Sequence, residues 1–425
     1  MADDEHRSAE PPAQEATPRG GLGSGRDEAP GRGPDDSPDD GPDDEPDDGS
    51  GGVGRWRRLV AAERARRKLS TGPVRPLAER LAEVGEAVAR SGAEWPDFYG
   101  DGVVTELEER TAELLGTAAA VWFPTGTMAQ QAALRCWAAR TGNPRVALHP
   151  GAHPVQHERD ALERLSGLQP VRIGSARAPV TAEDVHGLDE PVGTVMLELP
   201  LVAAGYALPT WDELNRTVEA AREREAVVHF DGARLWESTT WFGRSLAEIA
   251  TLADSVYVSF YKSLRGLSGA ALAGPADVVG EARAWRHRYG GNLVQQWPAV
   301  LTALAGLDRE LPRLPSYVAR ARLVAAELRA AFDAAELPFA AVHPEEPHTH
   351  QFEVWLAGDP DALTLAAVRQ AEETGTALFG LWWAAGPPGL AATDVTVEAP
   401  GLDWTAEDVR EAARTFLAYA DRARA

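Results

Sequence analysis

Short apolar runs alternate with longer amphipathic segments along most of the chain. Six runs rich in aliphatic, β-branched or aromatic residues have the length of buried strands: residues 118–123, 145–149, 170–173, 195–198, 227–231 and 256–260. Segments between them, such as residues 105–115 and 210–224, repeat apolar side chains at helical spacing. Strands that alternate with helices of this length are typical of a mainly parallel sheet with helices on both faces. The sequence therefore predicts an α/β fold.

A second, smaller unit is predicted towards the C-terminus. After a helix at residues 278–288, further helix is interrupted near Pro312 and Pro315 and then resumes as far as Leu328. Beyond it, the pattern predicts strands at 351–356 and 394–397 and helices at 361–374 and 405–420. The domains predicted are a tail at 1–54, a helical segment at 55–100 that includes a helix at 76–90, a large domain at 101–297, and a helical connection with a small C-terminal α/β domain at 298–425.

Composition narrows the class of protein. The chain has 425 residues, 44% of them hydrophobic, and no apolar run near the ~18 residues that a membrane helix needs. The acidic N-terminus lacks the apolar stretch of a signal peptide. Cys136 is the single cysteine, which excludes an internal disulfide and a thiolate metal cage. We therefore expect a soluble, cytoplasmic protein with no membrane partner.

The net charge of −23 is concentrated at the N-terminus. Residues 1–50 hold sixteen Asp or Glu against four Arg, and the motif Pro-Asp-Asp recurs in them, which predicts a disordered acidic tail. Seven Arg or Lys follow within residues 55–68. Because this stretch lacks the interleaved aromatic residues of a single-strand binder, we expect a solvated helix that the acidic tail can contact, and no nucleic-acid partner.

Lys262 is the first candidate for chemistry, because the chain has one other lysine, Lys68, and forty arginines. It follows the strand at 256–260, and Gly266 and Gly269 after it allow the backbone to pass close to a ligand. Burial disfavours an ammonium ion, which lowers the pKa of the amine and makes it a nucleophile towards carbonyl carbon. The alternative is a lysine at a strand end whose ammonium group reaches solvent.

Asp231 ends the apolar run before that strand. An aspartate at the carboxyl end of a parallel strand points into the crevice where open α/β sheets bind their ligands. A carboxylate there can pair with the ring nitrogen of pyridoxal and keep the ring protonated as an electron sink. The alternative is that Asp231 caps the next helix.

The turn at Gly126 and Thr127 leads from a strand into a helix. The first helical turn offers unpaired N–H groups and the positive end of the helix dipole, so this turn is a candidate phosphate site. The sequence Thr-Gly-Thr is equally an ordinary helix N-cap.

Three histidines, His149, His153 and His157, stand four residues apart, a spacing that could present three ligands to a metal from one helix. Pro150 and Pro154 make one continuous helix across them unfavourable, and Pro154 fits best in a first helical turn. We therefore predict no metal site.

Three ordered motifs carry a resemblance to a known family: FPTGTMAQQ at 123–131, HFDGARLWES at 229–238 and SFYKSLRGLSGA at 259–270. They resemble the threonine aldolase and aromatic amino acid β-eliminating lyase family. The resemblance implies the aspartate aminotransferase-like fold of fold-type I enzymes that depend on pyridoxal 5'-phosphate (PLP). It also implies a small-molecule amino acid as substrate.

The resemblance assigns roles to individual residues. Lys262 would carry PLP as a Schiff base, Asp231 would pair with the ring nitrogen, and His153 would stack on the ring near the β-hydroxyl proton of the substrate. The phosphate ligands would be Gly126, Thr127 and Ser259. These roles make Lys262, His153 and Asp231 the expected catalytic residues.

The resemblance also implies a substrate site and a reaction. Arg234 would clamp the substrate carboxylate, and Tyr99 matches a tyrosine that approaches the active site of a neighbouring subunit, so a homodimer or homotetramer is expected. The reaction implied is cleavage of a β-hydroxy-α-amino acid to glycine and an aldehyde. The alternatives are β-elimination on another amino acid and a PLP-fold protein that binds without turnover.

The chain departs from the family pattern in three places. Leu199 to Leu201 stand where the family has Asn-Thr-His after a glutamate, Val294 stands in place of an arginine, and Thr393 aligns with a second arginine that helps to hold the carboxylate. Because that cationic anchor is absent, the sequence does not identify threonine itself as the substrate.

Overall fold

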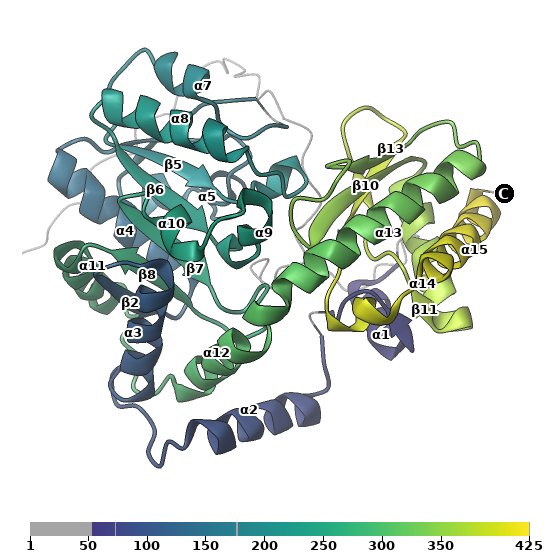
Figure 1. Ribbon diagram of the computed structural model, residues 1–425, viewed down its shortest axis with the longest axis horizontal. Helices are drawn as coiled ribbons and strands as arrows, with labels where there is room; N and C mark the ends of the chain where they lie inside the picture. Colours follow the sequence, from purple (N-terminus) through teal and green to yellow (C-terminus); the bar gives the residue numbers. More distant parts are fainter. Residues whose placement is uncertain (1–52, 73, 176, 425) are drawn as a thin grey trace, which may run out of the picture.

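The computed structural model describes residues 53–424 except 73 and 176. The prediction of a disordered tail lies outside this part of the chain, apart from residues 53 and 54. The described chain forms a large unit around a seven-stranded sheet and a smaller unit around a four-stranded sheet, joined by a long helix (Figure 1). Among the described residues, no helix is both long and apolar enough to cross a lipid bilayer.

The large sheet has the strand order β2-β8-β7-β6-β5-β3-β4. Its strands are β2 (Ala119–Phe123), β3 (Arg145–Leu148), β4 (Gln169–Arg172), β5 (Thr194–Glu198), β6 (Val227–Gly232), β7 (Ser255–Ser259) and β8 (Ala270–Gly274). The five strands from β7 to β4 are parallel, and β8 runs antiparallel to both β7 and β2. This confirms the mainly parallel sheet, and each of the six strand predictions corresponds to a strand. Strand β8 follows the Lys262 turn and was not among the strands predicted from the sequence.

Along the strands of the large sheet, successive side chains point alternately towards two layers of helices, one on each face. On one face, Tyr257, Leu272 and Val121 pack with helices α4 (Gly126–Thr141) and α11 (Ala276–Arg288). On the other face, Val258 and Ala271 pack with a second set of helices. That set comprises α3 (Val103–Leu115), α8 (Trp211–Glu223), α10 (Leu246–Ala250) and α12 (Trp297–Arg309). The central strands are buried on both faces, as expected for a parallel sheet.

Short helical segments fill the connections. They are α5 (His153–Gln156), α6 (Ala161–Arg164), α7 (Ala182–His186), α9 (Thr239–Phe242), η1 (Val202–Ala204), η2 (Leu235–Glu237), η3 (Leu311–Arg313) and η4 (Ala399–Asp403). Helix α5 follows the carboxyl end of β3 and carries His153 of the candidate site.

The smaller unit is an antiparallel sheet covered by helices. Its strand order is β12-β13-β10-β9, with β9 (Ala340–His343), β10 (Gln351–Ala357), β12 (Trp383–Ala384) and β13 (Leu390–Thr396). Helices α13 (Leu314–Ala334), α14 (Pro360–Thr374) and α15 (Ala406–Arg424) pack on it. Helix α13 belongs to both units, since Tyr317 joins the core of the large one and residues from Ala321 onward join the core of the small one.

The basic N-terminal segment differs from the prediction of a single solvated helix. Helix α1 (Arg55–Arg64) ends early, and β1 (Arg67–Lys68) pairs with β11 (Thr376–Ala377) of the small unit. Ala61 and Ala65 bury their side chains against α14, and Arg57 forms an ion pair of 2.8 Å with Glu372. The small alanines on one face of the basic helix explain this docking.

Helix α2 (Leu77–Ser91) confirms the prediction at 76–90, but its packing is unusual. Figure 1 shows it along one edge of the molecule, where it contacts α12. Ala87 is its single buried residue, and Leu77 and Leu81 are 82% and 71% exposed.

Candidate active site

Lys262 lies in the turn directly after β7, at the edge of a cleft between the two units. The turn is closed by the Arg265 amide, which donates to the Lys262 carbonyl at 3.1 Å. The cleft has a volume of about 380 Å³, and its lining includes Lys262 and Arg234 from the large unit and Thr393 from the small one. The lysine is thus partly covered by protein and open to a small-molecule space.

Asp231 lies beside this lysine at the carboxyl end of β6. In the sheet it is paired with Glu198 of β5 on one side and Tyr257 of β7 on the other, and its side chain is buried. Burial and the neighbouring Glu198 raise the pKa of Asp231 from 3.8 to about 7, while the positive charges of His153 and Lys262 oppose that rise. The carboxylate therefore interacts with both of the other groups that were predicted to be catalytic.

His153 is held in place by two carboxylates. Its backbone amide donates to Glu198 Oε2 at 3.0 Å, and its ring Nδ1 lies 3.2 Å from Glu158 Oε1. Gln131 donates to the other oxygen of Glu158 at 3.1 Å and fixes that carboxylate in turn. The histidine ring is thus oriented from its Nδ1 side, a geometry that selects its tautomer.

A phosphate-sized anion has suitable donors at the amino end of α4. Thr125 is the N-cap and accepts from the Met128 amide at 3.2 Å, which leaves Gly126 and Thr127 in the first helical turn with N–H groups that have no partner within the helix. The cap and the candidate anion site therefore coexist. Gly126 is required here, because a Cβ at this position would lie 2.1 Å from the Tyr257 hydroxyl.

Ser259 ends β7 on the same face as Tyr257, the face against which α4 packs. Its side chain is fully buried, and its hydroxyl makes no hydrogen bond within the described residues. A buried hydroxyl without a partner is costly unless a ligand supplies one. Ser259 and the amino end of α4 together fit a bound phosphate group.

Arg234 follows Asp231 and lines the cleft with Lys262. It is 9% exposed, and its guanidinium lies 5.3 Å from the centroid of the Tyr206 ring. The ring fixes the planar guanidinium at the cleft wall, where it can present two parallel N–H groups to a carboxylate.

Tyr99 is not brought into the site with these residues. It does not line the cleft of its own chain, its side chain is 48% exposed, and its amide donates to the Val294 carbonyl at 3.0 Å. Tyr99 therefore lies on an open surface of the described chain, next to the loop in which Val294 replaces an arginine.

Of the other two histidines of the triplet, His149 lies outside helix α5, whereas His157 directly follows that helix and its ring centroid lies 5.2 Å from that of His153. Helix α5 begins at His153 with Pro154 in its first turn, as predicted, and is four residues long. His149 accepts from the Gly151 amide at 2.9 Å and lies 2.6 Å from the Ser175 carbonyl, so both of its ring nitrogens take part in local structural contacts.

Sequence reasoning missed several residues of the site. Tyr206 has a left-handed backbone (φ 63°) and is buried, and the glycine before it was the one available signal. Glu198 was noted as part of a departure from the family motif, but its clamp on His153 was not predicted. Trp383 lines the cleft from β12 of the small unit, a position that no local pattern in the sequence indicated.

Together, the fold and these residues define an enzyme-like site. A mainly parallel sheet brings an amine, a buried carboxylate, an oriented imidazole and an anion cradle to the carboxyl ends of adjacent strands. This donor set fits PLP, with an amine for its aldehyde, a carboxylate for its ring nitrogen, and helix N–H groups with the Ser259 hydroxyl for its phosphate.

The comparisons identify the family. Residues 83–354 match the beta-eliminating lyase family, and the chain belongs to it. The chain is 29% identical over 246 residues to a low specificity L-threonine aldolase of Escherichia coli K12, and the aligned residues cover 55% of this chain and 72% of that protein.

Solved structures agree on the fold. The crystal structure of a putative L-allo-threonine aldolase from Listeria monocytogenes matches with a TM-score of 0.78 and 33% identity, over 86% of this chain and 99% of that one. A serine palmitoyltransferase of Sphingomonas wittichii matches at 17% identity with a TM-score of 0.56, over 81% and 84% of the two chains. The chain thus has the fold of fold-type I PLP-dependent enzymes, as predicted.

Proposed function

We propose that the protein is a PLP-dependent lyase that cleaves a β-hydroxy-α-amino acid at the Cα–Cβ bond, giving glycine and an aldehyde. The observation that carries this proposal is the position of the buried Asp231 at the carboxyl end of β6, beside β7, whose following turn carries Lys262. When bound, PLP supplies an electron sink for the electron pair left at Cα. Lys262 would hold its aldehyde, Asp231 its ring nitrogen, and Gly126, Thr127 and Ser259 its phosphate.

Arg234 and His153 would select the bond that breaks. Arg234, fixed by Tyr206 at the cleft wall, binds the substrate carboxylate and so orients the substituents at Cα. His153, whose Nδ1 side faces Glu158, presents Nε2 as its basic nitrogen to the β-hydroxyl proton. Removal of that proton breaks the Cα–Cβ bond and releases the aldehyde.

A second candidate, β-elimination on another amino acid, is supported by Thr393. This residue lies in the cleft, 1% exposed, where the family pattern has a carboxylate-binding arginine. With one cationic clamp fewer, the carboxylate is held by Arg234 with greater rotational freedom about Cα, which lowers the selectivity for one bond.

The deciding experiment is a substrate panel with the PLP-loaded protein. Aldehyde release from β-hydroxy amino acids, abolished by Lys262→Ala, supports the cleavage proposal. Release of ammonia and a keto acid from amino acids with a β-leaving group, without any aldehyde, supports elimination. A protein that binds PLP and releases neither product would be a binding protein, and both lyase proposals would be wrong.

We propose in addition that the protein works as a homo-oligomer. Leu77 and Leu81 of α2, and Trp95 and Phe98 in the segment after it, are between 64% and 82% exposed, and large apolar side chains exposed in this way are typical of an interface. Tyr99 adjoins them and, as the family resemblance suggests, would reach the site of a second subunit. Light scattering tests this: Leu77→Asp combined with Leu81→Asp should yield monomers, whereas an unchanged assembly, or a monomeric wild type, would contradict it.

A further inference from the structure

The turn that carries Lys262 contains an unusual arginine. Arg265 has a φ of 61°, in the left-handed region that favours glycine, although glycine follows it at position 266. A side chain kept at such a position indicates that the side chain itself has a task. The proposed mechanism does not use this one.

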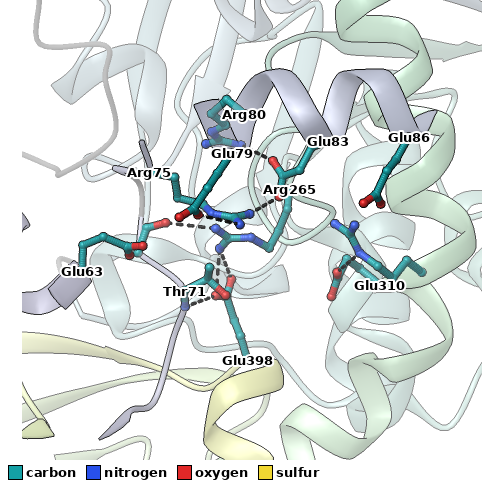
Figure 2. Close-up of polar contacts among 12 residues, drawn as sticks. Glu63, Thr71, Arg75, Glu79, Arg80, Glu83, Glu86, Arg265, Glu310 and Glu398 are labelled. Carbon is teal, nitrogen blue, oxygen red and sulfur yellow. Dashed lines mark hydrogen bonds and ion pairs between the residues drawn. The ribbon is translucent and has the colours of Figure 1, made fainter. Parts of the chain in front are cut away.

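The Arg265 side chain reaches across the cleft wall to the small unit. Its guanidinium makes two hydrogen bonds of 2.8 Å to the Glu398 carboxylate and donates to the Gly72 carbonyl at 2.9 Å. The Arg265 side chain is 15% exposed and that of Glu398 is 7% exposed. Figure 2 shows the guanidinium pointing to Glu398, with Glu83 of α2 nearby.

Glu398 extends the contact to the N-terminal segment. Its carboxylate accepts from the Thr71 amide at 2.8 Å, and its own amide donates to the Leu69 carbonyl at 2.9 Å. Three segments that line the cleft therefore meet at one ion pair: the Lys262 turn, residues 69–72, and the strand end at 397–398.

A second link runs parallel to the first. Ser263, next to Lys262, donates to Glu237 at 3.2 Å, and the other oxygen of Glu237 lies 2.6 Å from His350 Nε2. The Nδ1 of His350 lies 2.8 Å from the carbonyl of Val397, the neighbour of Glu398. Two residues of the Lys262 turn are thus linked to neighbouring positions of the small unit. Arg265 contacts Glu398 directly, and Ser263 is linked to Val397 through Glu237 and His350.

We propose that Arg265 and Glu398 are positioning residues, and that their ion pair sets the location of the Lys262 amine by tying its turn to the small unit and to residues 69–72. The role concerns the lyase site proposed above and rests on that function. Since a displacement of about 1 Å in a catalytic group can cost about 100-fold in rate, removal of the pair should lower kcat by about 10- to 100-fold and change KM less.

The variants follow from the geometry. Arg265→Gly removes the side chain while keeping a residue that favours the observed φ, and Glu398→Gln retains an acceptor for the Thr71 amide. Either change alone leaves one buried charge without its partner, whereas the double variant, which combines the two changes, removes both charges. Arg265→Lys keeps the charge but lacks the second nitrogen, Nη2, with which Arg265 donates to the Gly72 carbonyl. The matched control is Arg283→Gln, which breaks an ion pair of 2.6 Å with Glu108 between α11 and α3, neither of which lines the cleft.

Three measurements are made on variants shown by circular dichroism to be folded. In the protein without cofactor, backbone exchange at residues 69–72 should quicken in the double variant and remain unchanged in Arg283→Gln. In the PLP-loaded protein, the pH titration of the visible absorbance band should shift, and kcat should fall as stated, with Arg265→Lys intermediate.

Faster exchange with an unchanged absorbance titration and unchanged kcat would overturn the positioning role and leave a structural one. Unchanged exchange would also overturn it. If the wild-type protein cleaves no substrate of the panel, the proposed function fails separately, because exchange and the absorbance titration still test the tie between Lys262 and the small unit.

Discussion

Asp231→Asn should stabilise the cofactor-free protein at neutral and alkaline pH. The wild-type carboxyl is buried beside Glu198, and its pKa rises from 3.8 to about 7. Each tenfold change in proton affinity is worth about 1.4 kcal/mol, so ionising this carboxyl inside the folded protein costs about 4 kcal/mol. Asparagine has similar shape, keeps an acceptor for the Ala233 amide and cannot ionise.

The sign of the pH dependence follows from the raised pKa. Below pH ~3.8 the carboxyl is protonated in both states, and its contribution to stability is fully present. Between that pH and about 7 the unfolded chain releases the proton while the folded chain keeps it, so the free energy of unfolding of the wild type falls as pH rises. The variant lacks this fall.

The assay is urea unfolding of the cofactor-free proteins between pH 5 and 8.5, with the exposed substitution Asp333→Asn as control. The advantage of Asp231→Asn over wild type should grow with pH towards an upper limit of about 4 kcal/mol, and the control should track wild type. Added PLP should stabilise wild type and should stabilise Asp231→Asn less. An advantage that does not vary with pH, or a destabilised variant at pH 8, would refute this reasoning.

Two further predictions concern packing and a buried ion pair. Gly126→Ala should weaken PLP binding and destabilise the fold by about 1–3 kcal/mol, because its Cβ would overlap the Tyr257 hydroxyl. The control is Gly280→Ala, whose Cβ would meet no atom within 4 Å and which should be neutral or stabilising. Equal effects of the two substitutions on stability would contradict the account. Burial opposes protonation of His350, but the negative charge of Glu237 outweighs burial and raises the pKa of His350. The pairing therefore stabilises the folded protein fully below pH ~6.5, and this stabilisation is lost as the pH rises through the raised pKa. His350→Gln should therefore cost more in urea unfolding at pH 6 than at pH 9, and parallel curves would count against the pair.

The sequence carries the sheet and the main chemistry, for reasons visible in particular residues. Buried parallel strands produce near-continuous apolar runs, so β5, β6 and β7 could be predicted together with the residues at their ends, Asp231 and Lys262. What lies across the cleft could not be predicted in this way. Glu398 and Trp383 meet the Lys262 side of the cleft only after the two units fold together, and sequence periodicity holds no information on such long-range pairs.

Helix boundaries show the same limit. The basic residues at 55–68 suggested a helix in water, but Ala61 and Ala65 form a small apolar face that fits α14. Helix α2 was predicted from Leu77 and Leu81, whose side chains are exposed in the single chain. This exposure is one of the observations on which the oligomer proposed above rests.

The most direct test of the account uses the fact that the chain has two lysines, Lys68 and Lys262, and that both line the cleft. The PLP-loaded protein is reduced with borohydride, digested, and mapped by mass spectrometry. Lys68 is engaged in an ion pair of 2.7 Å with Glu63, so the account predicts the pyridoxyl label on Lys262 alone, and its loss in Lys262→Ala but not in Lys68→Ala. A label on Lys68, or no label in a protein that binds PLP, would contradict the account.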